Sequence, residues 1–409
     1  MGYLLNRALC IKTIIITHLT NRFRIFMNIV ILVRIMWTGG AQKIAIKETE
    51  YIQKLGHNVK LIFLRKVQSG ELLLDMLKGL NWEIYSESNR SNWVYSSITS
   101  YFSPDRKGEG TVDYDLISDF AKGFSKFDAD YIICHDQFAG IAGYKIKRRL
   151  GISYSVFIHE RVDGYYSKPI LGMFARHVEK KVLANASFVF SVTEKVSKSI
   201  QQLYSIPSYT NLPGIELESC IPYQERENIL LCVSVWDKDR DPQAYLPIIS
   251  KLKNFRLIIA GRWRDNSLRN LFVTKIEDLN LKNQVTLVEK LTEEQLKNLY
   301  KKAKFCLRYG KDEMGPGMSN LESLSQCTPI IVNGELGFAD FIRVHGVGFV
   351  SELWNYKDIC EYIINKDEAQ NYLQLQRNIK KAIKVCSWQS HAQSLIVQLL
   401  RYDDQLYRS

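Results

Sequence analysis

A polar, glycine-bearing segment, Tyr309–Val332, has residue types that bind an anion beside a sugar. The segment is predicted to pass from a loop into a short helix at Ser319. Such a loop directs backbone N–H groups and a helix N-terminus, here from Gly317 and Met318, toward a bound anion such as a diphosphate. Glu322 falls in the first helical turn, where its carboxylate can accept hydrogen bonds from sugar hydroxyls. The segment therefore predicts a site for a nucleotide or a nucleotide carrying a sugar.

The same helix start has a second interpretation that requires no ligand. The sequence Ser319-Asn-Leu-Glu322 fits a capping box, in which Glu322 folds back onto the first amide of the helix. The preceding glycines and the cationic turns elsewhere in the chain favour the anion site over the capping box.

Two turns rich in cations each follow a predicted strand in the second half of the chain, at residues 236–240 and 261–264. Carboxyl ends of parallel strands lie along one edge of a sheet, so these cations should gather there. Charge-assisted hydrogen bonds to a diphosphate are favourable in such a place. A solvated loop explains any one of these cations, but two such loops at one edge favour binding. The cations are Lys238, Arg240, Arg262 and Arg264.

The first half of the chain has its own candidates at predicted strand ends. Gly39 and Gly40 would let a ligand approach the backbone at the mouth of the sheet, although a tight turn explains the pair equally well. His135 and His159 each end a strand and are placed to touch a ligand. Hydrogen bonding to a neighbouring loop is the favoured interpretation for His135 and the less favoured one for His159. Metal binding is not expected, because no third ligand has a matching spacing.

The elements that position these residues alternate between apolar runs and helical periodicity, which predicts an α/β fold with parallel strands. Residues 67–110 break the alternation and are predicted to be irregular and aromatic. A chain of 409 residues is expected to form two domains. The expected parts are a leader or N-terminal extension (1–26), an N-terminal domain (27–204), a linker (205–227), a C-terminal domain (228–385) and a C-terminal helix (386–409), whose packing back on the N-terminal domain is left open.

Net charge and cysteine usage indicate which partners and which cellular compartment to expect. A net charge of +12 favours contact with an anionic membrane surface, nucleic acid or phosphorylated substrate, unless the lysines are simply solvated. Eight cysteines without a Cys-x-x-Cys pair predict buried thiols in a reducing compartment, and hence a cytoplasmic protein. No apolar run reaches the roughly 18–20 residues that span a bilayer. The first 26 residues are expected to be a basic amphipathic anchor or an extension upstream of the true start.

The chain also contains a set of short motifs: Trp37-Thr-Gly-Gly-Ala-Gln-Lys43, Leu212-Pro-Gly-Ile215, Gly315-Pro-Gly-Met-Ser-Asn-Leu-Glu322 and Cys327-Thr-Pro-Ile-Ile-Val332. In their order and spacing, and together with His159 and Gly261, these motifs resemble those of the GT-B glycosyltransferases, and within them the retaining family 4. The resemblance implies two Rossmann-like domains facing each other across a cleft. It also implies a nucleotide-sugar donor, a glycan or lipid-linked hydroxyl acceptor, and transfer with retention that uses no cofactor and no obligatory metal.

By position, the resemblance also implies roles for single residues. Glu322 matches the second glutamate of the family's pair, which holds the donor ribose, and Arg240 falls where the family has its phosphate-binding lysine. Gly39 and Gly40 match the loop near the phosphate and the acceptor. His159 matches a histidine close to the transferred sugar.

The chain departs from the family pattern at two positions. The family's first glutamate falls at Met314, so Glu313 would need a one-residue bulge to orient the sugar. The arginine expected before the phosphate lysine falls at Val235, so Lys238 or Arg262 would supply the missing cation.

Four other possibilities remain open. A metal-dependent GT-A transferase is suggested by Asp-x-Asp pairs, and a catalytically inert nucleotide-sugar or glycan-binding relative by Met314 and Val235. A DNA-modifying glycosyltransferase ranks low, because no basic-aromatic repeat or recognition helix is present. Peripheral membrane docking through the basic runs 145–149 and 180–181 competes with a solvated helix face. The Asp-x-Asp pairs are Asp113/Asp115, Asp128/Asp130, Asp237/Asp239 and Asp239/Asp241.

Overall fold

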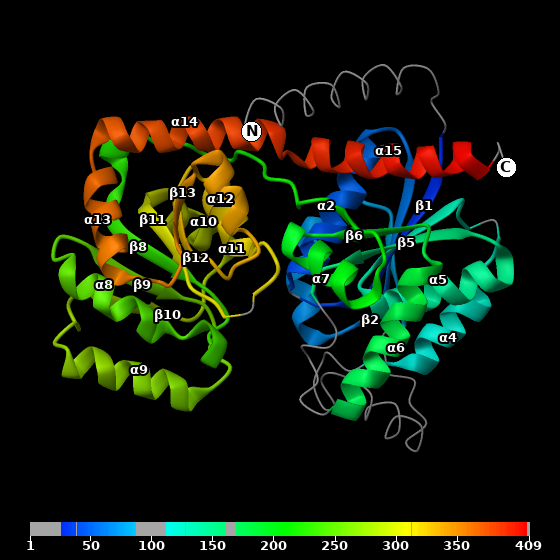
Figure 1. Cartoon of the computed structure of the whole chain (residues 1–409), viewed down its shortest axis with the longest axis horizontal. Helices are drawn as coiled ribbons and strands as arrows, with labels where there is room; N and C mark the ends of the chain where they lie inside the picture. The colour runs from blue at the N-terminus through cyan, green and yellow to red at the C-terminus, as the bar shows by residue number, and fades with distance from the viewer. Residues whose placement is uncertain are drawn as a thin grey trace. The chain divides into compact units, whose positions relative to one another are not determined.

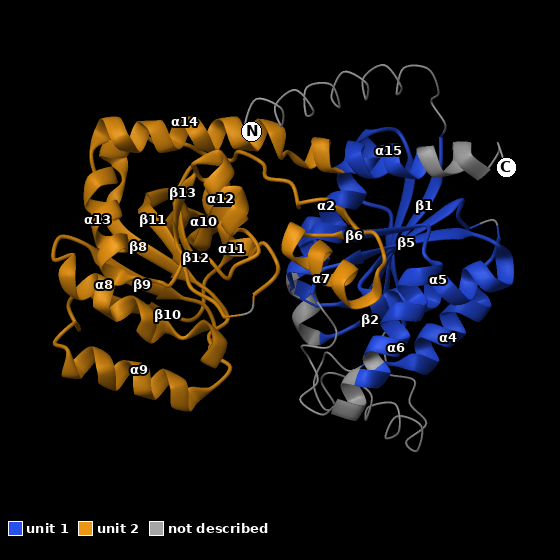
Figure 2. Cartoon of the chain, viewed as in Figure 1, with its two compact units in different colours: residues 1–190, 392–409 blue, residues 191–391 orange. Residues whose placement is uncertain are grey.

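The computed structural model describes residues 26–37, 39–86, 112–126, 128–160, 169–311 and 313–406. Almost all of the expected leader, most of the aromatic stretch up to residue 110 and the polar run after Glu160 lie outside these residues. The chain divides into two compact units, residues 1–190 with 392–409 and residues 191–391 (Figure 2). This division falls earlier than the linker expected at 205–227, and it groups residues 392–409 with the first unit.

The first sheet has seven strands in the order β3-β2-β1-β4-β5-β6-β7. Figure 1 labels its strands β1, β2, β5 and β6. The pairings of β1 with β2 and β4, of β2 with β3, and of β4 with β5 are parallel. The strands are β1 (Asn28–Met36), β2 (Asn58–Lys66), β3 (Trp82–Ser86), β4 (Tyr131–His135), β5 (Ser153–Ile158), β6 (Phe188–Ser191) and β7 (Tyr209–Thr210). The helices between them are α2 (Gly40–Lys54), the 3-10 helix η1 (Gln68–Leu77), α4 (Tyr114–Gly123), α5 (Gln137–Leu150), α6 (Pro169–Asn185) and α7 (Glu194–Tyr204).

The second sheet has six strands in the order β10-β9-β8-β11-β12-β13. All five of its pairings are parallel. The strands are β8 (Glu227–Val233), β9 (Arg256–Ala260), β10 (Val285–Val288), β11 (Ala303–Arg308), β12 (Ile330–Asn333) and β13 (Gly348–Ser351). The helices that accompany it are α8 (Leu246–Lys251), α9 (Asn266–Asp278), α10 (Glu293–Lys302), α11 (Met318–Ser325), α12 (Ala339–His345), α13 (Tyr356–Lys366) and α14 (Ala369–Val385). The last helix, α15 (Trp388–Leu406), falls in the first unit from residue 392 on.

Both sheets have the Rossmann strand order, which confirms the predicted α/β fold with two Rossmann-like domains. In each sheet the chain starts at a central strand, moves outward on one side and then crosses to the other side. The reversal falls between β1 and β4 in the first sheet and between β8 and β11 in the second. Doubly wound sheets bind ligands at the carboxyl ends of the strands next to such a reversal. The residues that follow β1, β4, β8 and β11 are therefore the first to consider.

The prediction that residues 67–110 are irregular is wrong for β3, which adds a parallel strand to β2 at the edge of the first sheet. Four of its five residues are only half-buried. This edge strand contains the polar residues Glu83 and Ser86 in addition to its apolar side chains. Such a mixed pattern lacks the continuous apolar run that marks a central parallel strand.

The cysteine prediction is wrong for one pair, because Cys220 and Cys327 form a disulfide. The amides of Glu218 and Ser219 donate to the carbonyl of Ser325 over 2.9 and 3.2 Å, which brings Cys220 to the end of α11. The fold thus brings together two positions that are separated by 107 residues in the sequence. Among the described cysteines, the free thiols are Cys134, Cys232, Cys306, Cys360 and Cys386.

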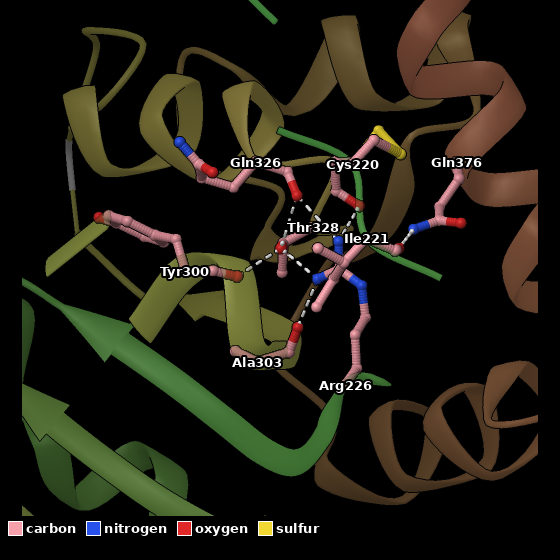
Figure 3. The surroundings of a disulfide bond; sticks show 9 residues. Cys220, Ile221, Arg226, Tyr300, Ala303, Gln326, Thr328 and Gln376 are labelled. Atoms are coloured by element: carbon pink, nitrogen blue, oxygen red, sulfur yellow. Dashed lines mark hydrogen bonds between the residues drawn. A yellow bond between two sulfur atoms is a disulfide. The ribbon is translucent and has the colours of Figure 1, made fainter. Parts of the chain in front are cut away.

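Arg226 joins the elements around this disulfide (Figure 3). Its buried guanidinium donates to the carbonyls of Ala303, Gln326 and Cys327 and to the hydroxyl of Thr328, at 2.7–3.2 Å. One side chain therefore ties the start of β8 to the start of β11 and to the turn that follows α11.

Candidate functional site

The loop after β11 is held in place by hydrogen bonds to its backbone. The amide of Tyr309 donates to the hydroxyl of Tyr245 over 2.8 Å. The side chain of Asn333 bonds to both the amide and the carbonyl of Gly310, at 3.1 and 2.8 Å. The amide of Lys311 donates to the carbonyl of Asp239 over 2.9 Å. This last bond fixes the glycine loop beside the first cationic turn.

Helix α11 begins at Met318, one residue earlier than predicted, with Gly317 as its N-cap at a positive φ of 67°. No side chain caps this end of the helix. The capping-box interpretation is therefore wrong. From an N-cap at Gly317, Glu322 lies beyond the third helical residue that a capping box needs, and its carboxylate instead accepts from the hydroxyl of Tyr300 over 3.2 Å.

The two cationic turns lie side by side, as predicted from the strand ends. Trp236 and Trp263 form a parallel bridge in which the amide of Trp236 donates to the carbonyl of Arg262 over 2.9 Å. Gly261 permits this approach, because a side chain there would meet the carbonyl of Ser234 at 1.9 Å. The side chains of Lys238 and Arg262 are exposed to solvent.

Asp237 organises the first cationic turn. Its carboxylate accepts from the amides of Asp239 and Arg240 at 3.2 and 3.1 Å. It also pairs with the guanidinium of Arg264 at 3.2 Å and with that of Arg240 at 3.8 Å. The Asp-x-Asp pairs of this turn thus belong to a turn-forming network, and no cluster of three or more metal-ligating residues occurs in the described part of the chain.

A buried ion pair lies at the centre of these elements. One terminal nitrogen of Arg308 contacts both carboxylate oxygens of Glu313, at 2.7 and 2.8 Å. The other donates to the hydroxyl of Ser234 and the carbonyl of Val233. Arg240 approaches the same carboxylate at 3.4 Å. Burial alone would raise the pKa of Glu313, but the guanidiniums of Arg308 and Arg240 outweigh it and hold that pKa below its ordinary value.

Comparison with known proteins assigns the family. The model for Glycosyltransferase Family 4 matches residues 38–218, and the model for Glycosyl transferases group 1 matches residues 221–384. The chain belongs to the GT-B glycosyltransferases. A curated relative, the O-antigen chain mannosyltransferase RfbU of Salmonella typhimurium, is 25% identical over 187 residues. That match covers 44% of this chain and about half, 51%, of the relative.

Solved structures share this GT-B fold at low sequence identity. Anabaena Alr3699/HepE in complex with UDP has a TM-score of 0.73 and 12% identity over 92% of this chain and 100% of its own. A glycosyltransferase of Rickettsia africae has a TM-score of 0.70 and 16% identity over 95% and 100% of the two chains. WaaG, a glycosyltransferase involved in lipopolysaccharide biosynthesis, has a TM-score of 0.63 and 15% identity over 90% and 98%.

In this GT-B chain, the carboxylate of Glu313 contacts two arginines, Arg308 and Arg240. Sequence reasoning missed Arg308, whose charge lies beside Val233 and Ser234, close to the chain position where the expected arginine is absent. The available signal was an arginine that follows the apolar run Phe305–Leu307 and lies five residues before an acid. One set of neighbouring elements in the second unit thus carries Arg240, Lys238, Glu313 and the start of α11.

The first unit holds the remaining predicted residues. Gly39 is the N-cap of α2, and a side chain at this position would meet Gln42 and Trp37 at 2.5 and 2.7 Å. Gly40 is the first residue of that helix. His159 directly follows β5, where its Nε2 lies 3.1 Å from the Nδ1 of His135.

Proposed function

We propose that this protein transfers a sugar from a nucleotide-diphosphate sugar to a hydroxyl of a glycan or lipid-linked acceptor, with retention of configuration. The observation that carries the proposal is the meeting of the cationic turn at Lys238–Arg240 with the glycine loop, joined by the bond from Lys311 to Asp239. Solved structures with the same fold bind UDP and UDP-glucose, which supports a nucleotide-sugar donor.

The proposed chemistry is electrostatic. As the bond between the sugar and the diphosphate breaks, negative charge grows on the diphosphate oxygen. Lys238, Arg240 and the amides of residues 317–319 stabilise that charge, with Arg262 as a further cation. The acceptor hydroxyl attacks the oxocarbenium-like sugar from the same face, and its proton leaves with the diphosphate. Neither a cofactor nor a metal is required in this scheme, so activity should survive a chelator.

Other side chains hold the donor in place. Glu322 accepts from the ribose hydroxyls while Tyr300 steadies its carboxylate. Glu313 sets the position of Arg240 through their contact at 3.4 Å, and its place beside the loop suits orientation of the sugar. His159 contacts the transferred sugar. The turn at Gly39–Gly40 contacts the phosphate.

We expect Arg240→Ala to reduce turnover about 100-fold, the loss typical of removing one preorganised group from a developing anion. Glu322→Ala should chiefly weaken donor binding. The measurement is hydrolysis and transfer from a panel of nucleotide sugars. The matched control is Arg256→Ala. Arg256 pairs with Glu227 at the amino ends of β9 and β8, whereas the cationic turns follow the carboxyl ends of these strands. Full activity in both Arg240→Ala and Glu322→Ala would refute the donor-site assignment.

An inert nucleotide-sugar-binding relative is the second candidate, favoured by Met314 and Val235 at the family's glutamate and arginine positions. The same assay separates the two. Nucleotide binding by calorimetry, with no hydrolysis or transfer from any donor, would select the inert protein.

We also propose that the protein docks peripherally on anionic lipid through basic residues of α5 and α6. None of the described helices is long and apolar enough to cross a bilayer. Lys145, Lys147 and Arg149 already donate to groups on α4, on α6 and in the turn after α4, which leaves the exposed Arg148 and Lys180 as the test positions. Arg148→Glu/Lys180→Glu should reduce co-sedimentation with phosphatidylserine vesicles several-fold at low salt. Unchanged co-sedimentation would exclude this surface.

A further inference from the structure

Asn320 holds the backbone of the glycine loop from the buried side. It lies in the first turn of α11, and its side chain is completely buried. Its Nδ2 donates to the carbonyl of Pro316 over 2.8 Å, and its backbone amide donates to the carbonyl of Gly317 over 2.9 Å. The partner identifies the nitrogen, because a carbonyl oxygen can only accept a hydrogen bond. Asn320 therefore closes the loop onto the start of the helix.

The bond to Pro316 determines how the peptide group between Pro316 and Gly317 is oriented. None of the described peptide bonds is cis, so the carbonyl of Pro316 and the N–H of Gly317 point to opposite sides of this peptide. Because the carbonyl is directed at the buried Asn320, the N–H points away from the interior. The amides of Met318 and Ser319 lie at the start of α11, where N–H groups have no carbonyl partner within the helix. Gly317 thus adds a third N–H at this end of the helix.

A glycine at this position allows the peptide to turn over. Gly317 has a φ of 67°, and glycine adopts φ angles of either sign at little cost. After such a turn, the carbonyl of Pro316 would take the place of the N–H and would repel an anion. The earlier part of the loop is fixed separately, by the bond from the amide of Gly337 to the carbonyl of Glu313 at 2.9 Å. The bond from Asn320 therefore selects one of the two orientations.

The other half of the Asn320 side chain shows that packing alone does not account for it. Its Oδ1 is buried and has no hydrogen-bond partner among the described residues. A buried oxygen without a partner lowers stability, and an apolar side chain of similar size, such as leucine, would avoid that loss. The useful part of this amide is therefore the hydrogen bond that it donates to Pro316.

We propose that Asn320 is a positioning residue that keeps the N–H of Gly317 directed at the diphosphate of the donor. The contact with the diphosphate rests on the proposed function, whereas the orientation of the peptide does not. Loss of one hydrogen bond to a charged group typically weakens binding by about 10- to 100-fold.

The first test measures the affinity of the full chain for UDP, GDP and ADP by calorimetry. Asn320→Leu should weaken binding of the tightest of these three by about 10-fold or more, with little shift in the midpoint of urea denaturation. Asn378→Leu is the matched control, because Asn378, on α14, donates in the same way to the carbonyl of Gly346, a glycine with a φ of 59°. Unchanged affinity in Asn320→Leu, or equal losses in the two variants, would overturn the proposal.

A second variant keeps the shape of the side chain and removes only the donor. Asn320→Asp is nearly the same size, but close to the N-terminus of α11 its carboxylate is ionised at neutral pH and can only accept hydrogen bonds. This variant should weaken nucleotide binding at least as much as Asn320→Leu. Binding as tight as in the native protein would show that the donated bond has no role.

A readout without nucleotide separates this proposal from the proposed function. Crystal structures of the unliganded proteins should show the carbonyl of Pro316 directed at Asn320 in the native chain and turned over in Asn320→Leu. The same peptide orientation in both would rule out a positioning role. If the native protein binds none of the three nucleotides, the proposed function fails, and the two crystal structures still decide whether Asn320 sets the peptide.

Discussion

Arg308→Met will lower the free energy of unfolding by about 3–5 kcal/mol, the usual cost of removing one partner from a buried ion pair. The guanidinium of Arg308 is 6% exposed and the carboxylate of Glu313 is 11% exposed. Without Arg308, the contact that the carboxylate keeps within the described part of the chain is the longer one with Arg240, at 3.4 Å. Urea denaturation of the full chain at neutral pH measures the loss.

Two further variants show whether the buried carboxylate causes this loss. Arg308→Met/Glu313→Gln should recover part of the stability, since the double change removes the uncompensated charge. Arg343→Met is the matched control, because Arg343 pairs with Asp340 at an exposed site and should change stability by less than about 1 kcal/mol. If Arg308→Met and Arg343→Met cost the same, the ion pair does not stabilise this unit.

The loss should also depend on pH in a defined direction. The pKa of Glu313 is held below its ordinary value of 4.5 in the folded protein, so its contribution is present above that pH and is lost as the pH falls through the folded pKa. In Arg308→Met, burial favours protonation of the same carboxyl group. The difference between the native protein and Arg308→Met should therefore be largest near neutral pH. It should narrow as the pH falls, first through the raised pKa of the variant's carboxyl group and then through the lowered pKa of Glu313 in the native protein.

Cys220→Ser will lower the free energy of unfolding by on the order of 4 kcal/mol, because a crosslink over a loop of about 100 residues removes much entropy from the unfolded chain. The disulfide closes a loop with a sequence separation of 107 residues, which includes most of the second sheet. Urea denaturation under non-reducing conditions measures the effect.

A reductant provides the internal check on the disulfide. Added reductant should lower the stability of the native protein to that of Cys220→Ser and should leave the variant unchanged. Cys386→Ser is the matched control, because Cys386 is a free, half-buried thiol. Equal stability of the native protein with and without reductant would contradict a stabilising crosslink.

Much of the architecture follows from local sequence patterns. Apolar runs such as β1, whose nine residues are buried or half-buried, mark parallel strands covered on both faces. The positions of the cationic turns also follow, because parallel strands put their carboxyl ends at one edge. The edge strand β3 is not predicted from the sequence, because its mostly half-buried residues form no continuous apolar run.

The partners of individual charged groups could not be predicted in this way. The sequence predicts a loop around Glu313, but the pairing of Glu313 with Arg308 depends on how that loop turns back over the end of β11. The pairing of His135 with Glu48 joins residues 87 positions apart, and that of Cys220 with Cys327 joins residues 107 positions apart. Spacing along the chain contains no information on such contacts.

The sequence by itself therefore determined the α/β class, the two Rossmann-like domains and the strand ends that carry the candidate residues. These features depend on short-range periodicity, which each segment carries alone. Three features were decided by the tertiary structure alone: the N-cap of α11, the arginine partners of Glu313, and the hydrogen bonds that join Glu48, His135 and His159. Hydrogen bonds and ion pairs form only within a few ångströms, and sheet order and helix packing bring distant residues within that range.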